Sequence, residues 1–327
     1  MESKYTGGFA VDTQEFITLL KMAQRKATIA GNSGPQVKGA LFRRYQSHIE
    51  TRWIVKDGVS SVSCFSIPTL RTNEACDESW DTFDGNTTNL WIADIAQVLG
   101  ILKFHGGVLN VNTHEDKIVF KSNNKQTTYT TNRKAQAHPF TRETLQTWAE
   151  KSEALATKIT FTESKTRLLN KPYFAPVYHS NGHGALNPDY AIEVDALDLF
   201  EACRCGTMNG QKAEKFYFAD KKVSGKISTL VVQVGDELKG STVSEVYGEV
   251  LSNAGTLFAK KGARVPEGTE DEKVCFTGGL NEVLKYVNGR VRLFFFDFTP
   301  YSEDAGVGLL MTWDNQKQWI FQASMVG

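Results

Sequence analysis

Residues 90–107 read LWIADIAQVLGILKFHGG, and the pattern in these residues recurs along the chain. Its apolar residues fall at helical spacing: Trp91, Ile92, Ile95, Leu99 and Leu102. This spacing predicts a short helix. The Gly106-Gly107 pair suits a helix stop, because glycine adopts the backbone conformations that end helices. Three short strands are predicted directly afterwards, near 107–113, 117–122 and 126–131.

The same order of elements is predicted in three other places along the chain. A helix over 13–28 precedes strands over 37–46, 47–56 and 59–67, and the hairpin dipeptide Asp57-Gly58 joins the last two. A strand at 190–194 and a helix from Ala196 precede strands near 214–219, 227–235 and 242–250. A helix over 280–287 precedes strands near 290–299, 306–313 and 317–323. The chain therefore contains four helices that each precede three strands.

This repeat predicts an α+β protein with two similar domains. One short helix above a small sheet buries too little apolar surface to be stable alone, whereas two such units side by side share a core. We expect the first domain over residues 1–132, with a surface excursion at 68–88, and the second over 177–327. Residues 133–176 fit neither domain, and we interpret them as an interdomain connector with a helical patch around Leu145, Trp148 and Leu155.

Composition restricts the function. The 37 basic residues balance the 37 acidic residues, so attraction to nucleic acid requires an uneven distribution of charge. The five cysteines are an odd number, and the N-terminus lacks the apolar run of a signal peptide, so we expect an intracellular protein with reduced thiols. No apolar stretch reaches the roughly 20 residues that a membrane-spanning helix needs. We therefore expect no association with a membrane.

Catalytic and metal-binding patterns give no support to an enzyme. Gly225-Lys226 is followed by Ile227, whereas a phosphate-binding loop needs Ser or Thr there. His179 and His183 are four residues apart, but no third metal ligand is evident. We expect no catalytic residue, no cofactor and no metal.

The fourfold repeat resembles the DNA sliding clamps, which include proliferating cell nuclear antigen and the clamps of tailed phages. Residues 90–102 are similar to a helix of the phage clamps, where a Leu-Gly-Ile-Leu step also precedes a strand, an acidic hairpin and another strand. Here those are the strands within 108–120 with Glu115-Asp116 at the turn, and residues 279–323 resemble the closing unit of these clamps. The resemblance implies a homotrimeric ring with the helices lining a central hole. It also implies that the ring encircles double-stranded DNA of any sequence.

Partners and location follow from the same resemblance. Such a ring tethers the replicative DNA polymerase as a processivity factor, and a clamp loader places it on DNA. We expect it in the cytoplasm, or in the host cytoplasm if the protein is viral.

Three sets of site residues are expected from the clamp resemblance. Basic residues on or beside the helices would face DNA: Lys21, Arg25, Lys26, Lys103, Arg204, Lys212 and Lys285. The helix from Ala196 also carries Asp195, Asp198 and Glu201, so an evenly positive hole is not expected. Apolar residues would form a pocket for partner peptides: Leu168, Leu169, Tyr173, Phe174, Val177, Met325 and Val326. Residues of two edge strands would join subunits: Thr127, Tyr129, Thr131, Val243, Val246 and Val250.

Other interpretations stay open at this point. The basic residues could be ordinary solvated helix faces, and the apolar residues could only pin the connector onto the sheet. The chain could be a processivity factor of the same fold that binds DNA electrostatically without closing a ring. It could also be an adaptor on the clamp fold, or a small-molecule enzyme whose site residues are scattered; a deep pocket with convergent charged groups would favour the enzyme.

Overall fold

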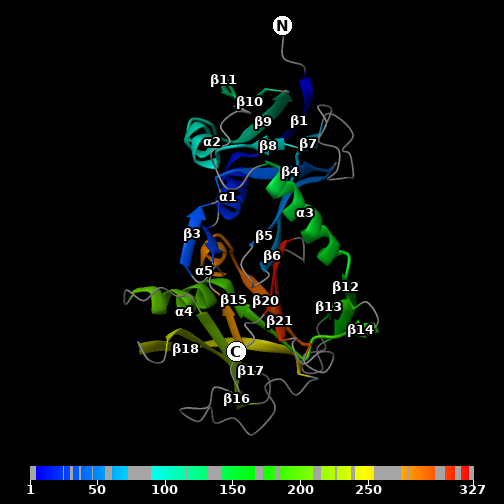
Figure 1. Cartoon of the computed structure of the whole chain (residues 1–327), viewed down its shortest axis with the longest axis vertical. Coiled ribbons are helices and arrows are strands. Elements are labelled where there is room, and N and C mark those ends of the chain that lie inside the picture. The colour runs from blue at the N-terminus through cyan, green and yellow to red at the C-terminus, as the bar shows by residue number, and fades with distance from the viewer. Residues whose placement is uncertain are drawn as a thin grey trace. The chain divides into compact units, whose positions relative to one another are not determined.

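The computed structural model divides into two compact units, whose course is shown in Figure 1. Unit 1 comprises residues 1–54 and 63–154, and unit 2 comprises residues 55–62 and 155–327. The structure describes residues 5–24, 26–29, 32–36, 38–45, 47–55, 61–72, 90–114, 116–130, 142–165, 172–180, 184–208, 215–224, 227–236, 240–253, 274–277, 280–298, 306–313 and 318–323.

Unit 1 is built on a five-stranded antiparallel sheet with the order β11-β10-β9-β1-β7. Its strands are β1 (Tyr5–Asp12), β7 (Arg71–Thr72), β9 (Val108–His114), β10 (Lys117–Ser122) and β11 (Lys125–Thr130). Four further strands follow the order β6-β5-β4-β8: β6 (Ser61–Pro68), β5 (His48–Val55), β4 (Ala40–Arg44) and β8 (Leu90–Ile92). A separate hairpin joins β2 (Lys26–Ile29) to β3 (Asn32–Gln36).

Helix α1 (Thr13–Ala23) brings the two sets of strands of unit 1 together. Its Phe16 is fully buried, and its ring centroid lies 6.1 Å from that of Phe9 on β1 and 6.1 Å from that of Phe42 on β4. Helix α2 (Ile95–Leu102) packs beside α1. Helix α3 (Arg142–Ala156) completes the unit and buries Trp148, Ala149 and Ser152. The core of unit 1 therefore lies around α1.

Unit 2 repeats this plan. Its main sheet has the order β19-β16-β17-β18-β15-β20-β21-β22. The strands are β15 (Tyr190–Asp195), β16 (Lys215–Ser224), β17 (Ile227–Asp236), β18 (Gly240–Asn253), β19 (Val274–Thr277), β20 (Arg290–Asp297), β21 (Val307–Trp313) and β22 (Gln318–Ala323). Helix α4 (Ala196–Met208) packs on β15, β17 and β18, and it contacts helix α5 (Leu280–Leu284). A small sheet, β12-β13-β14, is formed by β12 (Ile159–Lys165), β13 (Pro172–Ser180) and β14 (Gly184–Leu186).

The predicted α+β repeat is confirmed in all four places. A strand and a helix precede three strands in β1-α1-β4-β5-β6, in β8-α2-β9-β10-β11, in β15-α4-β16-β17-β18 and in β19-α5-β20-β21-β22. Apolar periodicity is sufficient for this result, because each helix buries one face and each strand alternates between two faces.

Three predicted helix boundaries are wrong: the first helix ends early, the second begins late, and the fourth, predicted over 280–287, ends at Leu284. The first helix ends at Ala23 with Gln24 as its C-cap, and Lys26 lies in strand β2 and not on a helix. Trp91 and Ile92 belong to β8, because β8 pairs with β4. The second helix begins only after Asp94, whose side chain accepts from Gln97 N–H at 3.0 Å and caps it.

The predicted connector at 133–176 contains α3, β12 and the first part of β13. The two units divide it between Ala154 and Leu155. Of the predicted excursion at 68–88, residues 68–72 are described and include β7, which pairs with β1. The predicted turn at Asp57-Gly58 lies outside the described residues. No helix in the described ranges is both long enough and apolar enough to span a membrane.

Candidate functional site

Strand β11 is an edge of the unit 1 sheet. It pairs with β10 from Lys125 to Thr130, and no other strand among the described residues pairs with it. Two of its predicted interface residues point inward. Tyr129 is buried and its hydroxyl accepts from the backbone N–H of Asp94 at 3.0 Å, and Thr127 Oγ1 lies 2.8 Å from His105 Nε2. Thr131 lies outside the described residues. The opposite backbone edge of β11 remains available for a further strand.

Strand β18 offers a second open edge, in unit 2. It pairs with β17 over residues 240–249 but with β15 only over 248–253, so residues 240–247 have a single partner among the described strands. Val243 on this open half is 60% exposed, whereas Val246 points into the unit and is buried. Val250 pairs with Ile192 of β15, which places it inside the sheet and away from the open half.

The predicted DNA-facing residues are mostly exposed where the structure describes them. Lys21 lies in the last turn of α1, Lys103 caps the C-terminus of α2, and Arg204 lies on α4. Lys285 follows α5, and its Nζ lies 4.8 Å from the centroid of the Tyr286 ring. Arg25 and Lys212 lie outside the described residues, as does the side chain of Lys26.

Acidic residues are also exposed on these helices. Glu15 is exposed on α1, and Asp198 and Glu201 are exposed on α4. Asp195 has a structural role, since its Oδ1 accepts from Leu197 N–H at 2.8 Å and caps α4. The exposed helix faces therefore carry both signs of charge, so they would attract a polyanion weakly.

The predicted partner surface centres on β13. Phe174 is 48% exposed, Val177 is half-buried and Tyr173 is buried. Side chains alternate along a strand, so Phe174 lies on the opposite face from Tyr173 and Val177. Leu168, Leu169, Met325 and Val326 lie outside the described residues. The structure thus brings only part of the predicted set to one strand and divides that part between two faces.

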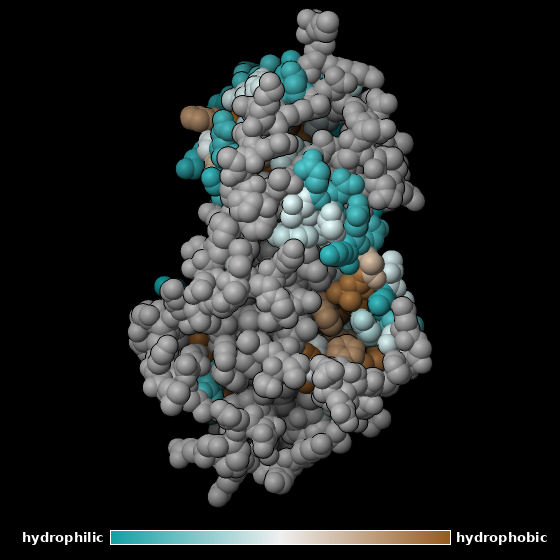
Figure 2. All heavy atoms as spheres, viewed as in Figure 1, coloured by the Kyte–Doolittle hydropathy of each residue, from teal (hydrophilic) through white to brown (hydrophobic). Residues whose placement is uncertain are grey.

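The face of β13 that carries Phe174 continues into an aromatic cluster that the sequence did not reveal. Tyr178, four residues further on the same face, packs edge-on against Phe298 with ring centroids 5.2 Å apart, and it stacks at 6.4 Å on Phe321 of β22. Phe161 of β12 pairs with Pro176 on this face. Figure 2 shows apolar residues gathered beside this small sheet. The alternation of side chains along the strand, which places Phe174 and Tyr178 on one side, was the sequence signal that could have revealed this face.

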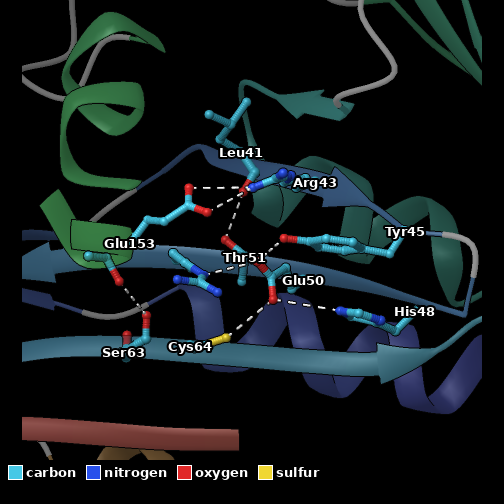
Figure 3. A network of polar contacts seen from close by, with 11 residues as sticks. Leu41, Arg43, Tyr45, His48, Glu50, Thr51, Ser63, Cys64 and Glu153 are labelled. Atoms are coloured by element: carbon cyan, nitrogen blue, oxygen red, sulfur yellow. Dashed lines mark hydrogen bonds and ion pairs between the residues drawn. The ribbon is translucent and has the colours of Figure 1, made fainter. Parts of the chain in front are cut away.

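Unit 1 also contains a buried polar network on β4, β5 and β6, drawn in Figure 3. Glu50 lies at its centre: its Oε1 accepts from Arg52 Nε at 2.9 Å and from the Tyr45 hydroxyl at 3.0 Å. His48 Nε2 lies 3.7 Å from Oε2, and the Cys64 thiol donates to Oε2 at 3.5 Å. Burial opposes ionisation of Glu50, but its contacts with His48, Arg52 and Tyr45 outweigh burial and lower its pKa to about 2.

This network holds helix α3 on the strands of unit 1. Arg43 of β4 donates to Glu153 of α3 at 3.2 Å, and Ser152 donates to Ser63 O at 3.4 Å. Burial raises the pKa of the Cys64 thiol, which keeps it protonated and a poor nucleophile. The ionic groups are engaged with one another, so the network is a structural element of the strands and α3. The described residues contain no group of three or more His, Cys, Asp and Glu side chains placed to hold a metal.

No protein-family model matches the chain, and no curated protein matches it in sequence. Solved structures do resemble it. The DNA polymerase sliding clamp from Bacillus subtilis has a TM-score of 0.54 at 9% identity, over 100% of this chain and 66% of that chain. The beta sliding clamp of Caulobacter crescentus has a TM-score of 0.52 at 13% identity, over 100% of this chain and 67% of that chain. Proliferating Cellular Nuclear Antigen from Entamoeba histolytica has a TM-score of 0.51 at 10% identity, over 99% of this chain and 100% of that chain.

These likenesses identify the architecture. The chain spans about two thirds of the length of the bacterial clamps and the full length of the Entamoeba protein. It has the sliding-clamp fold, which confirms the predicted resemblance and the predicted fold class.

Proposed function

We propose that this chain is the subunit of a DNA sliding clamp. Three copies close head to tail into a ring that encircles duplex DNA of any sequence and tethers a replicative DNA polymerase. The observation that carries the proposal is the clamp fold with a strand in each unit, β11 and residues 240–247 of β18, that has a partner on one side only among the described strands. Head-to-tail addition of β11 to β18 would satisfy both rows of backbone groups, and a closed ring would leave neither of these two edges unpaired.

The length of the chain supports three subunits. It spans the whole of a proliferating cell nuclear antigen chain and only about two thirds of a bacterial clamp. The clamp resemblance implies a ring of six domains. A chain with two domains then needs three copies to form that ring. We propose the domain boundaries of 1–132 and 177–327, with 133–176 as the connector, because each of the two domains holds two of the four repeats.

The mixed charge of the helix faces supports retention of DNA by a closed ring. Proteins that hold DNA by contact alone release many counterions and need a strongly basic surface. The exposed faces of α1 and α4 instead carry Glu15, Asp198 and Glu201 beside Lys21 and Arg204. A closed ring needs only weak contacts with phosphate, and weak contacts permit sliding. This balance argues against a processivity factor that binds DNA electrostatically without closing.

The proposed activity requires no catalysis, and the chain acts as a scaffold. Its buried ionic groups in unit 1 are occupied with one another, as described above. The partners are double-stranded DNA, the replicative polymerase and a clamp loader. Partner peptides would dock on the aromatic face of β13. The apolar side chain of an anchor residue in the peptide would pack against Phe174. We propose that the ring works in the cytoplasm, or in the cytoplasm of the host if the protein is viral.

The mass of the protein in solution tests ring closure. Light scattering at several protein concentrations should give three times the subunit mass of 36.4 kDa. Val243→Lys, which places a charge on the open half of β18, should shift the protein towards monomer. Leu70→Lys is the matched control, because Leu70 is 59% exposed against 60% for Val243 but lies on neither open edge. A monomer at high concentration would contradict the ring.

Release from circular and from linear DNA distinguishes retention by a closed ring from electrostatic binding. After loading onto a nicked circular plasmid, the protein should stay bound through a salt wash and leave when the plasmid is cut once. A protein that binds electrostatically would be removed equally from both forms by salt. Equal loss from both forms would favour the non-ring processivity factor.

A further inference from the structure

Helix α2 is attached to the edge strand β11 at both of its ends. At the N-terminus, the backbone N–H of Asp94, the capping residue of α2, donates to the Tyr129 hydroxyl at 3.0 Å. Beyond the C-terminus, His105 Nε2 lies 2.8 Å from Thr127 Oγ1. Tyr129 and Thr127 are two residues apart on β11 and point to the same side, towards the interior of the unit.

His105 is itself firmly held. Its backbone N–H donates to Leu102 O at 3.0 Å, so the residue continues directly from the last turn of α2. Its second ring nitrogen, Nδ1, lies 2.8 Å from the hydroxyl of Ser122 on β10, and the residue is only 7% exposed. The imidazole therefore joins the end of α2 to both strands of the β10-β11 hairpin. Burial, helped by the charge of Lys125, lowers the pKa of His105, which keeps the ring neutral.

An edge strand needs such attachment more than an interior strand does. Among the described strands, β11 has a hydrogen-bonded neighbour on one side only, so its backbone is held in line by β10 and by its inward side chains. A strand that is already ordered loses less conformational entropy when a second strand adds to it. The two attachments to α2 supply this order at Thr127 and Tyr129.

We propose that His105 and Tyr129 are positioning residues for ring closure, because they hold β11 against the two ends of α2 in the conformation that receives β18 of the next subunit. This inference rests on the proposed function. It also means that α2, one of the helices proposed to line the hole, and the closing edge move as one body. Neither side chain touches the partner subunit in this arrangement, so both act through β11.

The hydroxyl groups of Thr127 and Tyr129 can be removed with little change in the shape of either side chain. Thr127→Val and Tyr129→Phe each delete one attachment, and Thr128→Val is the matched control, since Thr128 is the neighbouring threonine on β11 and its side chain is exposed on the other face. Thr127→Ser keeps the hydroxyl and should restore the wild-type behaviour. The readouts are subunit association, from sedimentation over a dilution series, and amide hydrogen exchange of β11 in the dilute monomer.

The expected result is a loss of association of up to about tenfold for Thr127→Val and for Tyr129→Phe, because the contribution of one neutral hydrogen bond sets the upper limit of the effect. Exchange of the β11 amides should become faster in both variants, while exchange in β1 and β9 stays as in the wild type. Thr128→Val and Thr127→Ser should associate like the wild type.

Two outcomes would overturn the inference on its own: a trimeric wild type whose Thr127→Val and Tyr129→Phe variants associate equally well, or variants with lower stability throughout unit 1 and no selective change in β11. A wild-type chain that stays monomeric would instead overturn the ring, and this inference with it.

Discussion

Glu50 and Arg52 form the closest ion pair of the buried network in unit 1, with Arg52 Nε 2.9 Å from Glu50 Oε1. The two residues are separated by one position on β5, so both side chains project from the same face of the strand. Glu50 is 4% exposed, and the Nη1 atom of Arg52 is buried without a hydrogen-bond partner. The guanidinium therefore depends on this carboxylate for its charge balance.

Glu50→Gln should destabilise unit 1 strongly. The amide keeps the size of the side chain but leaves the Arg52 charge buried without a counterion, and removing one partner of a buried pair costs about 3–5 kcal/mol. Denaturant unfolding at pH 7 measures the loss. Glu163→Gln is the control, because Glu163 is exposed on β12 and should change stability by less than about 0.5 kcal/mol. Equal stability of the two variants would show that the network contributes nothing.

The same pair predicts a loss of stability in acid. Because the pKa of Glu50 is about 2 in the folded chain and 4.5 is its ordinary value, the unfolded chain takes up the proton first as the pH falls. The contribution of Glu50 is complete above pH 4.5 and disappears between pH 4.5 and pH 2; its full size is roughly 3 kcal/mol. Unfolding measured from pH 7 to pH 2.5 should show the difference between wild type and Glu50→Gln shrinking in this window. A constant difference would contradict the assignment.

The repeat of strand, helix and three strands was predictable because it follows from the local periodicity of apolar residues. Residues 117–122 form β10 with the predicted bounds, since their alternation needs no distant partner to be recognised. Helix ends were harder. At the second helix, Asp94 with Gln97 three positions later was a capping signal, and it outweighs the apolar spacing that extended the predicted helix back to Trp91.

Contacts between distant residues could not be predicted from one sequence. Arg43 and Glu153 are 110 positions apart, and nothing in the chain between them indicates that α3 lies on β4. The open half of β18 depends in the same way on where β15 stops pairing, at Val194 opposite Gly248. Both strands named in the interface prediction have an unpaired side among the described residues, but the sequence did not show which of their side chains point inward. Tyr129 and Val246 are buried, although both were expected at a subunit contact.

Charge reversal on two helices should have opposite effects on DNA retention. In the proposed ring, Lys21→Glu on α1 would remove a phosphate contact and should shorten the lifetime of the loaded ring on circular DNA. Glu201→Lys on α4 would remove repulsion and should lengthen it. Each change should alter the salt dependence of retention by about one phosphate contact per subunit. The measurement is dissociation from circular DNA at several salt concentrations, with Lys151→Glu, an exposed position on α3, as the control. Identical salt dependence in all variants would remove these helices from the DNA-facing surface.

Phe174→Ala tests the partner surface, because this side chain is the exposed end of an aromatic face whose other members are packed. Tyr178 is held by Phe298 and Phe321, so its removal would damage unit 2, whereas Phe174 is 48% exposed and can be truncated with little effect on folding. An anchor in a peptide-binding surface contributes at least about 1–2 kcal/mol, so the affinity for the replicative polymerase should fall about tenfold or more.

Surface plasmon resonance with immobilised protein measures this affinity, and light scattering should show an unchanged trimer. Leu70→Ala is the control, since Leu70 is equally apolar and 59% exposed but lies outside unit 2. A polymerase that binds both variants like the wild type would mean that the face of β13 only anchors the small sheet to unit 2. The docking site would then have to be sought elsewhere, because Phe174 is the one residue of the predicted pocket that the described part of the chain leaves largely open.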